Sequence, residues 1–379
     1  MTLLAPQRPG RSSRTAGRFW PLAVVEALAT PHGIDRYLEL VHPMLTVRDL
    51  RAEVTDVRRS TEDTVTLTLR PTRQWKGFEA GQFVRVSIDI DGVRRTRCYS
   101  PACSQHRADG RVELTIKAHP DGLVSRHLHA HAAPGLVVGL SQADGAFTLP
   151  SPRPERALLI SGGSGITPVL SMLRTLLDER HTGEVVFLHY AFGERDVAHL
   201  DELRSIAAAH HNVRLVLAFT GQAESADGAG GDLHGRFRAQ HLKAAAPWYR
   251  EAETFVCGPL GLTTAIRAHY TDAKLDDRLH TEEFTPTPIV PAGGDAAGEL
   301  TFNSTGTSAA NDGTPILEQA EAAGLAPEHG CRMGICFSCT AVKTSGCTRN
   351  VLTGELNSDP DTEIQVCVSA PVGDVAIDL

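Results

Sequence analysis

Aromatic residues are scarce in this sequence, at 5% of 379 residues, which argues against a large aromatic recognition surface. No apolar run reaches the roughly 18 to 20 residues that a membrane-spanning helix requires. Excess positive charge is also lacking: the net charge is -8 and the pI is about 6.1, which argues against nucleic acid as the main partner. The remaining composition, 41% hydrophobic and 22% charged, is that of a globular protein, and the length of 379 residues predicts two or three domains.

The first eighteen residues contain Arg8, Arg11, Arg14 and Arg18 but no acidic residue. The apolar stretch that follows, FWPLAVVEALA (19–29), is short, includes a glutamate and lacks both a twin-arginine pair and a small-residue cleavage site. We therefore expect no secretory signal and a reducing, cytoplasmic location. Two interpretations of the basic segment stay open, a disordered tail and a docking arm for an acidic partner or an anionic membrane surface.

Three cysteines lie within nine residues, CRMGICFSC (331–339), and a fourth, Cys367, lies further along the chain. In a reducing compartment such crowding indicates a metal rather than disulfides. The spacing C-x4-C-x2-C with a distant fourth cysteine is the plant-type [2Fe–2S] pattern, and Gly334 helps the loop approach the cluster closely. Zinc is the alternative, although zinc sites favour two separate cysteine knuckles. We predict that a cluster is held by four thiolates and that Cys347 is only a packed residue. The predicted ligands are Cys331, Cys336, Cys339 and Cys367.

The secondary structure that the sequence predicts changes along the chain. Before residue 150, β-type segments at 65–70, 83–90 and 112–117 predict an antiparallel barrel. From 157 to 284, strand and helix patterns alternate, with helices through about residue 180, near 196–209 and near 260–272, which predicts a parallel sheet covered on both faces. A small mixed unit carries the cysteines from residue 299 onward. We expect residues 285–298 to be a linker and 223–232 a mobile surface loop.

The segment ALLISGGSGITP (157–168) has the order strand, glycine turn, helix. Gly162, Gly163 and Gly165 let the backbone approach a pyrophosphate at the helix N-terminus. The alternative is a glycine-rich turn that binds no ligand. The context predicts a dinucleotide site.

Two further segments resemble a known protein family. EQAEAAGLAPEHGCRMGICFSC (318–339), followed by IQVCVSAP (364–371), resembles plant-type ferredoxin domains. In some bacterial reductases these are fused to a flavin barrel and a nicotinamide domain of the ferredoxin–NADP reductase superfamily. The resemblance implies a multi-domain fold: an antiparallel β-barrel flavin domain, an α/β parallel-sheet nicotinamide domain and an α+β, β-grasp-like ferredoxin domain. The implied boundaries are 1–45 for a basic and helical extension, 46–150, 151–285, 286–298 for the linker and 299–379.

The resemblance also implies the flavin contacts. RCYS (97–100) matches the R-x-Y-S motif of the superfamily, in which Arg97 would clamp the flavin phosphate, Tyr99 lie against the ring and Ser100 hydrogen-bond at N5. KAHPDGLVSRHL (117–128) resembles a K-x4-G-x2-S element that receives a pyrophosphate at a helix start, which favours FAD over FMN. The residues implied there are Lys117, Gly122 and Ser125.

The histidines that follow, His127, His129 and His131, have two interpretations. The outer two lie at i, i+4 and would face one another on a helix, as a metal pair does. No carboxylate or cysteine completes a ligand set there, so we predict surface helix residues.

GGSGITP also resembles the nicotinamide element of the superfamily, and this implies contacts from Gly162, Gly163, Ser164, Gly165, Thr167 and Pro168. FVCGP (255–259) resembles the second such element. It implies that Cys257, a neutral thiol, positions the nicotinamide beside Gly258 and Pro259; a buried structural cysteine is the alternative. HTEEFTP (280–286) resembles the segment that returns to the flavin, where Phe284 would cover the ring.

The choice between NADH and NADPH depends on two neighbouring charges. Arg195 would pair with a 2′-phosphate, while Glu194 would repel it. We predict NADPH.

These parts imply an electron-transfer reductase that takes hydride from NAD(P)H to FAD and passes single electrons through a [2Fe–2S] cluster. The predicted acceptor is an iron-containing oxygenase or a membrane acyl desaturase. TPHGIDRYLELVHPMLTVRDLRAEV (30–54) resembles the N-terminal region of actinobacterial reductases that serve membrane fatty-acid desaturases. Such a partner would bring the protein into peripheral contact with the inner face of the membrane. Two alternatives stay open: the reductase of a ring-hydroxylating or steroid-hydroxylating oxygenase, and a non-catalytic redox-sensing module.

Overall fold

The computed structural model describes residues 34–120, 122–221, 231–284, 297–330, 332, 334, 337 and 339–379. The chain divides into two units, residues 1–49 and residues 50–379. The second unit contains three separate β-sheets, which share no strand.

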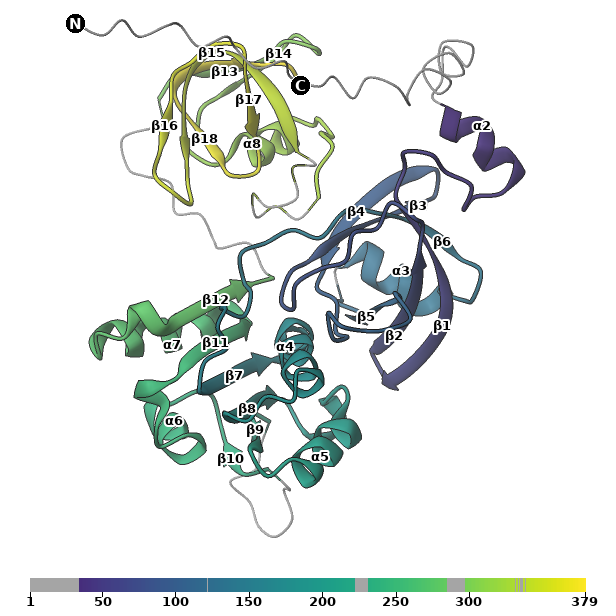
Figure 1. Cartoon of the computed structure of the whole chain (residues 1–379). Coiled ribbons are helices and arrows are strands. Elements are labelled where there is room, and N and C mark those ends of the chain that lie inside the picture. The colour runs from purple at the N-terminus through teal and green to yellow at the C-terminus, as the bar shows by residue number, and fades with distance from the viewer. Residues whose placement is uncertain are drawn as a thin grey trace, which may run out of the picture. The chain divides into compact units, whose positions relative to one another are not determined.

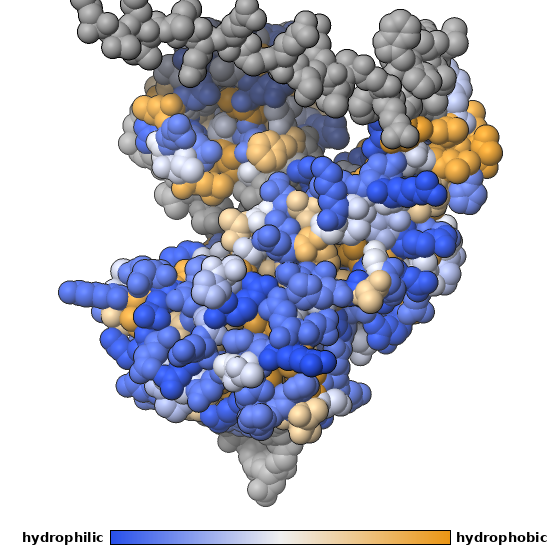
Figure 2. Space-filling view, in the orientation of Figure 1, coloured by the Kyte–Doolittle hydropathy of each residue, from blue (hydrophilic) through white to orange (hydrophobic). Residues whose placement is uncertain are grey.

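The described part of the first unit is a short helix, α2 (Ile34–Val41), and the turn that follows it. The buried carboxylate of Asp35 accepts hydrogen bonds from the backbone N–H groups of Val47, Arg48 and Asp49, at 2.5 to 2.8 Å. These bonds fold the segment back on the start of the helix. Apolar side chains gather over α2, where Leu40 is 84% exposed (Figure 2).

The first sheet of the second unit is antiparallel and has the strand order β4-β3-β6-β1-β2-β5. A bridge between Pro101, just after β4, and Leu114 of β5 joins the two edge strands, which closes the sheet into the predicted barrel. Helix α3 (Leu123–His131) contributes Val124 and Leu128 to the barrel core. The strands are β1 (Arg51–Thr61), β2 (Thr64–Pro71), β3 (Val84–Ile90), β4 (Val93–Tyr99), β5 (Val112–Lys117) and β6 (Val137–Leu140).

The second sheet is parallel throughout, in the order β10-β9-β8-β7-β11-β12. Helices α4 (Ile166–Asp178) and α5 (Leu200–Ala209) cover one face, and α6 (Ala239–Ala245) and α7 (Leu260–Asp272) cover the other (Figure 1). The predicted α/β layer architecture is confirmed. The strands are β7 (Arg156–Gly162), β8 (Glu184–Ala191), β9 (Val213–Phe219), β10 (Leu233–His234), β11 (Glu253–Gly258) and β12 (Leu279–Glu283).

Some details differ from the sequence predictions. The helix expected near 196–209 begins only at Leu200, because residues 194–196 form a 3₁₀ turn and His199 adopts a left-handed conformation with φ of 61°. Helix α6 was not predicted, since its seven residues are too few to show a helical period. The predicted loop at 223–232 and the predicted linker at 285–298 lie almost wholly outside the described residues.

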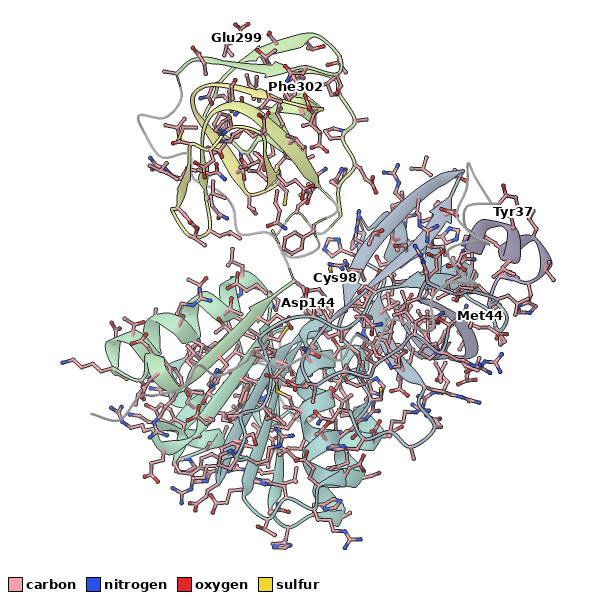
Figure 3. The ribbon with its side chains drawn as sticks, turned by 45° about the horizontal axis from the view of Figure 1, so that its top comes forward. Tyr37, Met44, Cys98, Asp144, Glu299 and Phe302 are labelled. Carbon is pink, nitrogen blue, oxygen red and sulfur yellow. The ribbon has the colours of Figure 1, made fainter. Side chains whose placement is uncertain are left out.

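The third sheet is mixed, with the strand order β14-β13-β18-β15-β16 and β17 paired to β15. Strands β13 and β18 are parallel, while the other pairs are antiparallel. Helix α8 (Ile316–Ala322) and the fully buried Phe302 fill the core, whereas Glu299 lies at the start of β13 and is exposed (Figure 3). The strands are β13 (Glu299–Phe302), β14 (Thr307–Ala310), β15 (Thr340–Asn350), β16 (Leu356–Asn357), β17 (Thr362–Gln365) and β18 (Ser369–Ile377).

Helix α4 fastens the parallel sheet to the barrel. Arg174 of α4 donates to the Glu113 carboxylate of β5 at 2.7 Å and to the Ala102 carbonyl at 2.6 Å. Ser171, one turn earlier, donates to the carbonyl of Cys103 at 2.7 Å. The Arg174 guanidinium holds the pKa of Glu113 below its ordinary value despite burial of that carboxyl. This contact fixes the distance between the two sheets, and a cavity lies between them.

Candidate functional site

A cavity of about 280 Å³ lies where the end of β4 meets the end of β12. Its wall combines residues from the barrel with residues from the parallel-sheet domain. The lining residues are Phe83, Arg97, Cys98, Tyr99, Ser100, Thr115, Lys117, His119, Gly122, Val124, Ser125, Ser164, Thr167, Glu282 and Phe284. Nine of the residues predicted from sequence are therefore brought together here: Arg97, Tyr99, Ser100, Lys117, Gly122, Ser125, Ser164, Thr167 and Phe284.

The R-x-Y-S segment lies at the end of β4. Arg97, Cys98 and Tyr99 are the last three residues of that strand, and Cys98 is labelled in Figure 3. Ser100 comes next and is 2% exposed, yet its Oγ has no hydrogen-bond partner in the described part of the chain. A buried hydroxyl without a partner costs about 1 to 3 kcal/mol, so its place in a cavity wall indicates a ligand atom there. Burial raises the pKa of the Tyr99 phenol, which stays neutral.

The start of α3 forms another side of the cavity. Ser125 Oγ donates to the Gly122 carbonyl at 3.2 Å and accepts from the His119 N–H at 3.2 Å. A Cβ on Gly122 would lie 2.3 Å from Ser125 Oγ, so this turn needs glycine. Lys117 lies beside it and pairs with Asp63 at 3.0 Å. A helix N-terminus with an adjacent ammonium group is the arrangement that binds a pyrophosphate, and the donor set fits FAD.

A second cavity, of about 640 Å³, lies at the glycine turn of the parallel sheet. The three glycines there have three different roles. Gly163 has a φ of 53° and open space where a Cβ would be, Gly162 would press a Cβ against Leu262 and Pro259 at 2.9 Å, and Gly165 would place one 2.3 Å from the Cys257 carbonyl oxygen. The cavity is lined by Gly162, Gly163, Tyr190, Ala191, Phe192, Thr220, Arg236, Phe237, Pro259, Gly261, Leu262 and Ala265.

The arginine predicted for the nucleotide does not line this cavity. Arg195 is exposed on the 3₁₀ turn 194–196, and the neighbouring Glu194 pairs instead with Arg204 at 2.7 Å. Arg236 lines the cavity and is the one charged side chain among its described lining residues. Sequence reasoning missed Arg236 because it lies in the short segment between β10 and α6, which has no helical or strand period.

Glu282 is the second residue that sequence reasoning missed. It lines the first cavity, and burial raises its pKa to about 8. Cys257 at the end of β11 is fully buried outside both cavity walls, and its Sγ donates to Glu282 Oε2 at 4.0 Å. Burial raises the pKa of the Cys257 thiol well above its ordinary value, in agreement with the predicted neutral thiol. Gly258 and Pro168 also lie outside the two cavity walls, whereas Pro259 lines the second cavity.

Two of the predicted cluster cysteines are described, Cys339 and Cys367, and both are buried. The Val366 N–H donates to the Cys339 carbonyl at 3.1 Å, and Thr340 pairs with Gln365 between β15 and β17. These contacts bring the two cysteines together although 27 residues separate them. Cys331 and Cys336 lie outside the described residues. Buried thiols from two converging segments fit a cluster held by thiolates.

Gly334, between Cys331 and Cys336 in sequence, approaches the turn that carries Cys367. Gly334 has a φ of 74°, and a Cβ there would lie 2.9 Å from the side chain of Val368. Cys347 is half-buried within β15 and accepts a hydrogen bond from Ser358 Oγ at 3.2 Å.

The histidines of α3 show no metal geometry. His127 and His131 stack with their ring centroids 4.6 Å apart. No group of three or more potential metal ligands occurs among the residues that the structure describes.

Comparison with known families assigns three segments of the chain. Residues 51–148 match the oxidoreductase FAD-binding domain, residues 159–268 the oxidoreductase NAD-binding domain, and residues 300–372 the 2Fe-2S iron-sulfur cluster binding domain. The last match includes all four predicted cluster cysteines.

Two relatives align with most of this chain. The chain is 37% identical to an NADPH oxidoreductase of Mycobacterium tuberculosis over 360 residues, which is 94% of this chain and 91% of that protein. It is 31% identical to a glycine betaine monooxygenase reductase subunit of Pseudomonas aeruginosa, over 79% of this chain and 87% of that one.

Among solved structures, phthalate dioxygenase reductase superposes on 88% of this chain and 98% of its own, with a TM-score of 0.55 and 23% identity. That likeness concerns the fold. The three domain matches and the 37% identity over nearly the whole length identify the lineage. The chain belongs to the ferredoxin reductase-type flavoproteins with a fused 2Fe-2S domain, and it is an NAD(P)H oxidoreductase that uses FAD and a [2Fe–2S] cluster.

Proposed function

We propose that this chain carries electrons from NADPH, through FAD and the [2Fe–2S] cluster, to an iron-containing oxygenase. The observation that carries the proposal is the first cavity, whose wall joins the flavin-motif residues to Glu282 and Phe284 of the nicotinamide domain. When bound, FAD supplies the conversion of a two-electron hydride into single electrons. The proposed domain boundaries are those of the sequence analysis, with the FAD domain at 46–150, the NAD(P) domain at 151–285 and the ferredoxin domain at 299–379.

The barrel residues would hold and orient the flavin. Arg97 would bind its phosphate, while the half-buried Tyr99 would cover the ring and exclude water from it. The unpartnered Ser100 hydroxyl would donate to the ring nitrogen that receives hydride. Gly122 and Ser125 at the start of α3, with Lys117 beside them, would receive the pyrophosphate.

On the other side of the cavity, Phe284 would cover the ring until nicotinamide replaces it. Cys257 would position the nicotinamide through its contact with Glu282, because its neutral thiol lies behind the wall that Glu282 lines. Ser164, Gly165, Thr167 and Pro168 would shape the turn at which the dinucleotide enters.

We expect Glu282 to make the affinity for oxidised nucleotide depend on pH. Its pKa is raised to about 8, so the group is neutral below that pH and becomes a carboxylate above it. The oxidised nicotinamide ring is cationic and the reduced ring is neutral, so a carboxylate favours NADP⁺. Between pH 7 and 9 the Kd for NADP⁺ should fall by about tenfold, which corresponds to roughly 1.4 kcal/mol.

Titration of the oxidised protein with NADP⁺ across this pH range measures that change. Glu282→Gln should remove the dependence because its amide does not ionise, whereas Glu283→Gln should retain it because Glu283 already pairs with Arg267. A Glu282→Gln protein with the same pH profile as the unchanged protein would contradict the assignment.

We expect the preference for NADPH to depend on Arg236 and much less on Arg195. Arg236 lines the second cavity, and Arg195 does not. We expect Arg236→Ala to lower kcat/KM for NADPH by roughly 30-fold, since hydrogen bonds to charged groups contribute about 1.5 to 3 kcal/mol, and to change the value for NADH far less. Arg195→Ala serves as the matched control, with little effect on either nucleotide. Equal losses for both nucleotides in the Arg236 variant would assign this side chain to the pyrophosphate instead.

Two observations support the proposed acceptor: the names of the relatives and the exposed apolar residues of α2 in the first unit. A glycine betaine monooxygenase reductase subunit and a stachydrine N-demethylase reductase subunit are among the relatives, which supports an iron oxygenase. A membrane acyl desaturase is the finer proposal, with peripheral contact at the inner face of the membrane. Three apolar residues of α2 support such contact, since Tyr37, Leu40 and Val41 are all exposed. Across the described residues, no helix is long and apolar enough to cross a membrane.

Purified protein should show flavin bands together with two irons and two labile sulfides per chain, as a [2Fe–2S] centre requires. Adding it with NADPH to a purified oxygenase, and separately to desaturase-containing membranes, tests the acceptor. Turnover only with oxygenases would remove the desaturase, and a protein that holds both cofactors but reduces no acceptor would favour the redox-sensing module.

A further inference from the structure

The cysteine loop carries an exposed aromatic residue. Phe337 lies between Cys336 and Cys339 and is 60% exposed. Its backbone φ is 55°, in the left-handed region that bulky residues rarely adopt. The Phe337 carbonyl accepts hydrogen bonds from the Thr340 N–H at 3.3 Å and from Thr340 Oγ1 at 2.8 Å. A turn held in an unfavourable conformation, with an apolar ring in solvent, indicates a function for that ring.

A second exposed apolar residue borders the same loop. Leu352 is 52% exposed, and its Cδ1 lies 3.3 Å from the point where Gly334 of the loop would carry a Cβ. Asn350 Oδ1 accepts from the Leu352 N–H at 2.9 Å, which fixes the turn after β15. The Val351 N–H donates to the carbonyl of Val368, the residue after Cys367. Phe337 and Leu352 therefore flank the segments that carry the proposed ligands.

The domain that carries these two side chains is acidic. Residues 299–379 contain eleven Asp and Glu against three Lys and Arg, a net charge of -8 that equals the charge of the whole chain. Arg332 pairs with Glu321, and the buried Lys343 donates to the carbonyls of Gly346 and Asn357. Glu328 and Glu355, close in sequence to the loop and to Leu352, are exposed.

We propose that Phe337 and Leu352, on an acidic domain in which Glu328 and Glu355 are exposed, form the docking surface for the electron-accepting protein, which would present a basic face with an apolar centre. The inference rests on the proposed function and adds the partner's surface to it. The electron leaves from the cysteine loop, so the acceptor must approach the side chains beside it. A small apolar centre within a charged rim is the usual anatomy of a protein interface, in which the centre carries most of the affinity and the rim sets the encounter rate.

Cytochrome c, a basic one-electron haem protein, serves as the probe. Each NADPH oxidised to NADP⁺ and a proton supplies two electrons, which reduce two ferric haems to ferrous. With the full-length protein carrying both cofactors, we expect Phe337→Ala combined with Leu352→Ala to raise the KM for cytochrome c about tenfold. Reduction of ferricyanide, a small anion that needs no docking surface, should stay unchanged. Val93→Ala is the matched control, because Val93 is 46% exposed but lies in β4 of the barrel.

The charged rim has its own readout. Glu328→Gln combined with Glu355→Gln should lower the rate of cytochrome c reduction at low ionic strength and flatten its dependence on salt. Iron and labile sulfide are measured in every variant, and Phe337→Asn, which tolerates the left-handed turn, replaces Phe337→Ala if that variant loses its cluster.

An unchanged KM for cytochrome c in the double apolar variant overturns the proposal. So does slower reduction of the protein's own cluster after rapid mixing with NADPH, because the surface would then serve the flavin side of the same chain. Wild-type protein that contains flavin but no iron would contradict the proposed function instead, so the two failures are distinguishable.

Discussion

We expect Cys367→Ser to separate the two halves of the reaction. The variant should still oxidise NADPH with ferricyanide at the rate of the unchanged protein, while its reduction of cytochrome c falls by about 100-fold or more, at the upper end of the effect of disturbing a metal's surroundings. The reason is positional. Cys367 follows β17, and the pairing of that strand with β15 brings Cys367 to Cys339. Serine at this position offers an alcohol oxygen in place of the thiolate that iron–sulfur clusters require.

The measurement combines iron and labile sulfide content with the two acceptor assays. Cys347→Ser is the matched control, because Cys347 lies in the same domain, is half-buried within β15 and accepts a hydrogen bond from Ser358. It should keep the cluster and both activities. Equal loss of cluster in the two variants would assign Cys347 to the ligand set, and retention of cytochrome c reduction by Cys367→Ser would place the cluster off the electron path.

The features readable from the sequence were those set by local spacing or by a residue's own chemistry. The C-x4-C-x2-C spacing, the strand–glycine–helix pattern and R-x-Y-S each lie within fifteen residues, so each can be recognised from one short stretch of sequence. Strands β2, β3 and β5 were predicted because their alternating or β-branched residues match a pleated sheet with a buried face.

The roles of residues whose surroundings come from segments far apart in the sequence could not be predicted in this way. Burial raises the pKa of Glu282, and its place is in the wall of a cavity that residues of the barrel and of the parallel-sheet domain line together. Nothing in HTEEF distinguishes it from Glu283, whose side chain pairs with Arg267. Arg236 and Arg195 both follow strands of the parallel sheet, and only the turn geometry decides that Arg236 lines the cavity. The exposure of Phe337 and Leu352 likewise depends on the folded domain.

The glycine turn gives the second large effect. We expect Gly165→Ala to destabilise the protein by about 2 kcal/mol, because overpacking costs typically 1 to 3 kcal/mol and the entropic gain of alanine offsets less than 1. The added Cβ would lie 2.3 Å from the Cys257 carbonyl oxygen and 2.7 Å from the Gly258 Cα, so backbone must move. Gly165 has an ordinary φ of -66°, which means that the clash, and not the conformation, is the cause.

The displaced backbone belongs to the proposed nicotinamide site, so stability and binding should fall together. Cys257 contacts Glu282, and a misplacement of about 1 Å there should lower the rate of flavin reduction by NADPH by roughly 100-fold. Thermal unfolding and rapid-mixing reduction measure the two effects. Gly193→Ala is the control, because its Cβ would meet only the Asp196 carboxylate at 3.5 Å, an ordinary contact. If Gly165→Ala matched Gly193→Ala in both measurements, the turn would have room to relax, and glycine would be needed at Gly163 for ligand approach but not at Gly165 for packing.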